Sequence, residues 1–177
     1  MAYNPHYKYF LATYEAIHPD DFSALYRLVQ DIVRDLINRK RPGIILGLAE
    51  MGFNRGNFIG GLHYAGTNHI YLNKSALRVM QQESSPELYK AFVLFLLLHE
   101  YTHAVGVQDE RLTRRLTEKM VLTVFPQDHP VTGLAVKGLA VYFPYTFNQR
   151  QHRPTRQELA NTEYVTIHHA DSEMTYN

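Results

Sequence analysis

The sequence contains no cysteine and no tryptophan among its 177 residues. The lack of cysteine excludes disulfide bonds, thiolate zinc sites and a cysteine nucleophile, and it permits a reducing compartment. Neither sign of charge dominates, because 18 basic residues stand against 17 acidic ones and the formal net charge is +1. Proteins that bind nucleic acid or an anionic membrane surface through charge need a basic excess, so we expect neither partner.

Long apolar runs are also absent. The longest, from Ala91 to Leu98, has eight residues, whereas a helix that crosses a bilayer needs roughly 20. The first residues lack the basic segment and apolar run of a secretory signal. Hydrophobic residues make up 45% of the chain, which is enough for one compact core. These features predict a soluble, cytoplasmic protein.

The first helix is predicted after Pro19, where Asp20 and Asp21 supply an N-cap and negative charge in the first turn. Apolar residues then recur every three or four positions until Pro42-Gly43 ends the pattern. The basic run Arg39-Lys40-Arg41 lies where this helix ends. We expect the run to be a solvated helix end, because cations are favoured there.

Three further helices are predicted in the second half of the chain. One runs from Ser85 to Val105, and its middle is apolar on all sides, which is typical of a buried central helix. Asp109 caps the next, which extends from Glu110 to about Phe125. Gly106 permits a reversal between the two, so we expect them to be antiparallel neighbours. A shorter helix is predicted over residues 130–141.

Short apolar segments bounded by glycine predict strands between the helix that follows Pro19 and the helix that starts at Ser85. A buried strand is expected over residues 44–48, a second over residues 58–64 and a third over residues 69–72, and the last two form a hairpin. Residues 146–177 are polar with little periodicity and are predicted to be a C-terminal tail. Residues 1–145 then form a single domain.

The clearest chemical pattern is the segment His99-Glu100-Tyr101-Thr102-His103 on the predicted buried helix. Two histidines four positions apart differ by about 40° around a helix, so their imidazoles share one face. Both can reach one zinc ion at about 2.0–2.1 Å. Glu100 lies beside that ion without ligating it, where a general base for an activated water is needed. The segment predicts a zinc peptidase, against the alternative of two core histidines with ordinary hydrogen-bond partners.

A third zinc ligand must come from elsewhere, and three acids compete. We favour Glu110, because it lies near the inward edge of the following helix. Asp109 suits an N-cap, yet its spacing from His103 is also the one by which metzincins place their third ligand. Glu118 is more simply explained by an exposed ion pair with Arg114, four positions earlier. All three stay open at this point.

The segment from Leu96 to Gly106, followed by Asp109-Glu110 and an arginine-rich helix, resembles the minigluzincins. These small soluble zinc peptidases are regarded as minimal versions of the catalytic domains of integral-membrane metallopeptidases. The resemblance covers residues 58–143. It implies an α+β fold in which a small, three-stranded mixed sheet packs on a buried active-site helix, and two histidines and a glutamate that bind zinc. It also implies latency, since a terminal segment of such proteins can occupy the cleft, for which residues 146–177 are the candidate.

The segment from Asn68 to Asn73 is similar to the edge strand that such peptidases set above the metal. An exposed edge binds an extended peptide through backbone hydrogen bonds. His69, Ile70 and Tyr71 are therefore candidate substrate-binding residues, and a peptide or an unfolded protein is the expected substrate. The alternative is a strand buried within the sheet. His63 is a further candidate for stabilising an oxyanion, against an ordinary surface histidine.

Two other functions compete with the peptidase. A metal-dependent RNA hydrolase can carry a related histidine spacing, but such sites usually have a further histidine just after the position of Gly106. Val107-Gln108-Asp109 stand there, and the near-neutral charge also disfavours RNA. A non-catalytic binding protein would keep zinc as a folding staple, in a closed four-ligand site without an exchangeable water.

Overall fold

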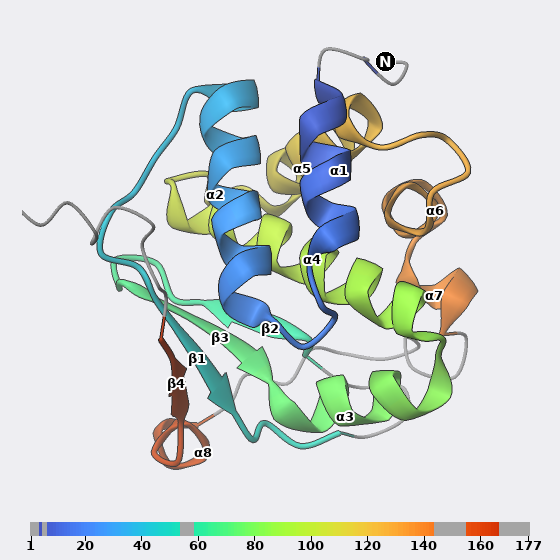
Figure 1. Ribbon diagram of the computed structural model, residues 1–177. Helices are drawn as coiled ribbons and strands as arrows, with labels where there is room; N and C mark the ends of the chain where they lie inside the picture. Colours follow the sequence, from blue (N-terminus) through green and yellow to red (C-terminus); the bar gives the residue numbers. More distant parts are fainter. Residues whose placement is uncertain (1–3, 5–6, 54–58, 144–154, 167–177) are drawn as a thin grey trace, which may run out of the picture.

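The computed structural model describes residue 4 and residues 7–53, 59–143 and 155–166. These residues form the expected α+β fold around a long central helix, α4 (Pro86–Ala104). A small mixed sheet lies on one side of α4, and the helices α1 (Lys8–Ala16) and α2 (Phe22–Ile37) lie on the other (Figure 1). The centre of the fold is therefore the helix that carries the His-Glu-x-x-His segment.

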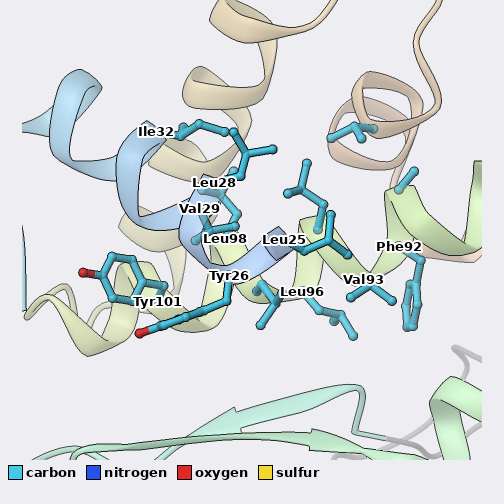
Figure 2. Close-up of a cluster of buried hydrophobic side chains, with 14 of the residues drawn as sticks. Leu25, Tyr26, Leu28, Val29, Ile32, Phe92, Val93, Leu96, Leu98 and Tyr101 are labelled. Atoms are coloured by element: carbon cyan, nitrogen blue, oxygen red, sulfur yellow. The ribbon is translucent and has the colours of Figure 1, made fainter. Parts of the chain in front are cut away.

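Helix α2 confirms the helix predicted after Pro19. The Asp21 carboxylate accepts a hydrogen bond of 2.8 Å from the backbone N–H of Ala24, which caps the first turn. One face of α2 is buried against α4, and Figure 2 shows the apolar side chains of the two helices meeting there. The buried residues of this contact include Leu25, Leu28, Val29 and Ile32 of α2 and Leu98 and Tyr101 of α4.

Helix α4 confirms the predicted central helix. The Ser85 hydroxyl caps its start by accepting a hydrogen bond of 3.2 Å from the backbone N–H of Leu88. The helix has 19 residues, and buried residues occur on all its sides because helices and sheet surround it. No helix in the described part of the chain is long and apolar enough to cross a membrane. The uniform burial of α4 thus comes from its central place in the fold.

The sheet has four described strands in the order β2-β3-β1-β4. Strand β1 (Ile45–Ala49) runs parallel to β3 (His69–Asn73), and β2 (Gly61–His63) pairs antiparallel with β3, which confirms the predicted hairpin. The prediction of three strands is wrong by one, because β4 (Glu163–Val165) pairs antiparallel with β1. Phe58, expected to start the second strand, lies outside the described residues.

Strand β4 comes from the segment predicted to be a tail. Gly47 of β1, which pairs with β4, allows the C-terminal segment to lie this close, because a Cβ on Gly47 would lie 2.6 Å from the Thr162 methyl group. An ion pair between Glu163 and Lys74 also ties the strand to the rest of the fold. A three-residue strand with exposed side chains shows no alternation in sequence, so its pattern could not be recognised.

The basic run lies directly after α2, and Arg39 and Lys40 are exposed as expected for a solvated helix end, but its arginines also contact the end of α4. Arg39 Nη1 donates to the carbonyl oxygen of Val105 at 3.2 Å, and Arg41 Nη1 donates to that of Ala104 at 2.9 Å. These carbonyls stand at the end of α4, where intrahelical donors run out. Arg41 Nη2 also donates to Asn68 Oδ1 at 2.8 Å. Arg41 therefore joins the end of α4 to the start of β3.

The remaining helices differ in how well the sequence predicted them. The helix expected from Glu110 is present with its Asp109 cap, whereas the one expected over residues 130–141 is broken at Gly138, which has a φ of 82°. Neither α1 nor the helix after β3 was predicted; the two are short, with nine and ten residues, so each shows little of a helical period. The helices not yet described are α3 (Lys74–Glu83), α5 (Glu110–Val124), α6 (Pro130–Lys137), α7 (Leu139–Tyr142) and α8 (Arg156–Leu159).

Candidate metal centre

Three side chains from two helices converge at the C-terminal half of α4. His99 and His103 lie on α4, and Glu110 is the first residue of α5. Glu110 Oε2 lies 3.5 Å from His99 Nε2 and 3.2 Å from His103 Nε2. Ligand atoms bound tetrahedrally to zinc at about 2.0–2.1 Å stand about 3.3 Å apart. All three ligand atoms lie within 4.8 Å of one another, so the group is arranged to hold a metal ion.

The loop that joins α4 to α5 fixes the orientation of His103. Gly106, with a φ of 98°, turns the chain so that the Val107 carbonyl oxygen lies 2.7 Å from His103 Nδ1. A carbonyl oxygen only accepts, so Nδ1 carries the proton and Nε2 faces Glu110. The Thr113 hydroxyl donates to the same carbonyl at 3.0 Å and holds it in place. This support of the candidate ligand His103 was not recognised in the sequence, which contains no pattern for it.

The charges of the three side chains also suit a cation. Burial lowers the pKa of His99 to about 4, against the opposing effect of Glu110, so this imidazole is neutral at pH 7. Partial burial alone would raise the pKa of Glu110, but His99, Arg114 and His103 together hold it below its usual range. A neutral imidazole and a carboxylate both present lone pairs. A cation can lie favourably among these acceptor atoms, as can a proton on either imidazole that is donated to the Glu110 carboxylate.

Glu100 lies beside this group, between α4 and β2. Its residue is 8% exposed, and its carboxyl accepts a hydrogen bond from the backbone N–H of His63. Burial raises the pKa of Glu100 to about 8, the charge of Glu110 adds to the rise, and the hydrogen bond from His63 opposes it. Glu100 is not among the three converging ligands. Glu100 is thus a buried carboxyl adjacent to the candidate ligands, and its expected role as a general base stays a prediction.

Two glycines allow β2 to lie directly on α4. A Cβ on Gly60 would lie 2.8 Å from Leu96 Cδ2, and a Cβ on Gly61 would lie 3.0 Å from Glu100 Cγ. Any side chain at either position would push the strand away from the helix. In the sequence, Gly60 and Gly61 only interrupt the apolar residues of the second predicted strand. Their role in this close approach could not be predicted without knowing that the strand lies on α4.

The residues proposed to bind substrate on β3 need a correction. Strand β3 is not an edge strand, because it is hydrogen-bonded to β1 on one side and to β2 on the other. The backbone of His69, Ile70 and Tyr71 is therefore not free to bind a peptide. Ile70 points into the core, and the rings of His69 and Tyr71 stack at 5.7 Å on the other face. The edge next to the metal centre belongs to β2.

His63 is not brought to the three ligands either. Its Nδ1 donates to the His69 carbonyl oxygen at 2.9 Å. Its Nε2 is buried and has no hydrogen-bond partner within the described residues. Within the described residues, His63 is linked to the candidate centre only by its backbone, which is hydrogen-bonded to Glu100.

The other two candidates for the third ligand have different partners. The Asp109 carboxylate caps α5 by accepting a hydrogen bond of 2.7 Å from the backbone N–H of Leu112. Glu118 is not part of the converging group. Its predicted ion pair with Arg114 is also wrong, because Arg114 Nε donates to Glu110 Oε1 at 2.7 Å. Sequence spacing could not decide this, since Arg114 is four positions from either glutamate.

Substituting the three acids one at a time tests the choice of Glu110. We expect Glu110→Gln to weaken zinc binding strongly, because an amide lacks the charge of the ligating carboxylate. Asp109→Asn is expected to bind zinc like the wild type, because asparagine caps a helix about as well as aspartate. Glu118→Gln is the second control. Zinc dissociation constants from chelator competition measure all three, and a larger loss in either control would assign the ligand to that residue.

The segment predicted to block the cleft is described only over residues 155–166. Strand β4 within it pairs with β1, at the opposite edge of the sheet from β2 and Glu100. This described part therefore does not occupy the candidate centre. Residues 146–154 and 167–177, the rest of the predicted tail, lie outside the described residues, so latency stays a prediction.

Comparison of the chain with protein-family models, with curated proteins and with solved structures gives no match. The resemblance to minigluzincins therefore depends on the sequence segment around His99, Glu100 and His103. The chain holds two imidazoles and one carboxylate in a geometry that fits a divalent metal ion.

Proposed function

We propose that the protein is a zinc-dependent peptidase of the gluzincin type. The observation that carries this proposal is the convergence of His99 Nε2, His103 Nε2 and Glu110 Oε2, with the Glu100 carboxyl beside them. Two histidines and one glutamate form a ligand set of catalytic zinc sites, which leave a further position for water or substrate. A closed structural site would need a fourth protein ligand, and none joins the group among the described residues.

The chain's own residues would divide the chemistry as follows. His99, His103 and Glu110 hold the ion, which when bound supplies Lewis acidity and lowers the pKa of water. Glu100 takes one proton from the attacking water and gives it to the nitrogen of the leaving amine, so the peptide bond breaks as the new C–O bond forms. The position of Glu100, directly after His99 and beside the group of three ligands, suits this transfer.

The substrate we propose is an extended peptide that adds to the edge of β2, which pairs with no second strand among the described residues. The backbone N–H of Asn73 donates to the Gly60 carbonyl at 2.9 Å, and hydrogen-bonded pairs alternate in an antiparallel ladder. The backbone groups of Gly61 and His63 consequently face away from β3. The backbone N–H of His63 is hydrogen-bonded to the Glu100 carboxyl. A peptide bound along this edge would therefore lie next to the proposed general base. Backbone binding of this kind suits unfolded segments of varied sequence.

Hydrolysis by the zinc-loaded protein tests the proposal. We expect the full-length chain with one equivalent of zinc to cleave an unfolded protein or a library of fluorogenic peptides. Removal of the ion by a chelator is expected to abolish cleavage, zinc to restore it, and a peptide hydroxamate to inhibit it. Mass spectrometry of the products locates the cleaved bonds.

Two outcomes would contradict the peptidase. If the zinc-loaded chain cleaves structured RNA but no peptide, the site belongs to a metal-dependent RNA hydrolase. If it binds zinc in a closed site that excludes a hydroxamate and cleaves neither substrate, zinc serves as a folding staple. Zinc content must be measured in each preparation, so that an empty site is not counted as an inactive one.

A further inference from the structure

Arg114 contacts the candidate metal ligand on the side away from the histidines. Its Nε donates to Glu110 Oε1 at 2.7 Å. The other carboxylate oxygen, Oε2, lies 3.2 Å from His103 Nε2 and 3.5 Å from His99 Nε2. The two oxygens of one carboxylate thus have separate partners. The guanidinium holds one oxygen, and the other is directed at the place between the imidazoles.

The contact has little value for the stability of the fold. The side chains of Arg114 and Glu110 are 67% and 49% exposed, and exposed ion pairs spaced four residues apart on a helix stabilise proteins only weakly. Glutamate before arginine is the favourable order for such a pair, so pairing with Glu110 rather than with Glu118 is expected from the helix alone. What the contact adds is a fixed direction of the Glu110 carboxylate, whose other oxygen faces the two imidazoles.

We propose that Arg114 is a positioning residue that holds Glu110 in its metal-binding orientation and so sets the metal affinity of the site. The inference depends on the proposed metal centre, but not on peptide hydrolysis. A glutamate side chain has three rotatable bonds, and an exposed one samples many rotamers. Fixing one oxygen by a charge-assisted hydrogen bond removes this freedom before the ion arrives.

The direction in which zinc affinity changes when Arg114 is replaced distinguishes a positioning role from simple charge repulsion. Arg114 is a cation close to a site for another cation, so direct repulsion weakens metal binding. If repulsion were its main influence, removing the charge would tighten zinc binding. If Arg114 positions the ligand, the same substitution weakens zinc binding.

Zinc affinity of the full-length protein, measured by competition with a chromophoric chelator, tests the proposal. We expect Arg114→Ala to raise the zinc dissociation constant by about 10–100-fold, the usual effect of losing a hydrogen-bond partner of a metal ligand. The matched control is Arg115→Ala, which removes the same charge from the next position, where the arginine is also exposed. The control is expected to bind zinc as tightly as the wild type, or slightly more tightly.

A second variant and a second measurement complete the test. Arg114→Gln restores a neutral donor without the charge, and we expect it to recover part of the affinity lost in Arg114→Ala. The unfolding temperature of the zinc-free proteins should be the same for all three variants, which a merely structural role would not give. Zinc binding by Arg114→Ala as tight as that of Arg115→Ala overturns the proposal. A wild type that binds no zinc overturns it together with the metal centre, whereas one that binds zinc but cleaves no peptide removes only the peptidase.

Discussion

Glu100→Gln is expected to abolish peptide hydrolysis while zinc stays bound. The amide has the size of the carboxyl but cannot take a proton from water, and loss of a general base typically lowers turnover by about 10²–10⁴-fold. The ligands His99, His103 and Glu110 are unchanged, so the zinc content should equal that of the wild type. Initial rates of peptide cleavage and metal analysis of the same preparation measure the two quantities.

The fold should tolerate this substitution. Glu100 is buried, and a neutral amide oxygen can still accept the hydrogen bond from the His63 backbone. We therefore expect an unfolding temperature no lower than that of the wild type, so a loss of rate would not reflect unfolding. Glu100→Ala should also lose activity, at the cost of a cavity beneath Gly61. Undiminished cleavage by a preparation free of contaminating protease would remove Glu100 from the mechanism.

His103→Ala is expected to lose both the metal and the activity. It removes one of the three ligands, so the loss of zinc affinity should exceed the about 10–100-fold that follows from losing an outer hydrogen-bond partner. Because a ligand that binds only the folded state stabilises it by about 4 kcal/mol at 1,000 times its dissociation constant, zinc should raise the unfolding temperature of the wild type. The variant should show no such rise. Scanning calorimetry with and without zinc measures the difference.

His69→Ala is the matched control for this experiment. His69 lies on β3, on the face of the sheet away from the core, and is not among the converging ligands. Zinc should stabilise this variant as it stabilises the wild type. An equal zinc-dependent rise in the unfolding temperature of His103→Ala would mean that the ion binds elsewhere.

The sequence predicted the central helix and the pairing of its two histidines because both depend on local geometry. A 3.6-residue period places positions four apart on one face, whatever surrounds the helix. The N-caps at Asp21, Ser85 and Asp109 are local in the same sense, and all three are present. Burial on all sides of α4 likewise followed from its composition.

The parts that could not be predicted depend on contacts between distant segments. Whether β3 is an edge or an inner strand depends on where β1 and β2 lie, which its own five residues do not encode. The capping of α4 by Arg39 and Arg41 joins positions more than 60 residues apart. Such contacts are set by packing of the whole chain, for which the residue pattern carries no local indicator.

Within the candidate centre the same division holds. The two candidate ligands on α4 follow from spacing, whereas Glu110, favoured in the sequence, was separated from Asp109 and Glu118 only by the position of α5 relative to α4. The hydrogen bond from His103 to the Val107 carbonyl depends on the turn at Gly106. That turn was expected, but the atom it would present to the imidazole was not.

The pairing of β4 with β1 bears on how the protein should be produced. A shortened chain that ends at residue 145, where composition alone suggests a boundary, would lack Glu163–Val165 and leave one side of β1 without hydrogen bonds. Ile45, already 42% exposed, lies on that strand. Unprotected strand edges invite pairing between molecules. Expression vectors for this protein should therefore encode the C-terminal residues, and shortened forms will be prone to precipitate.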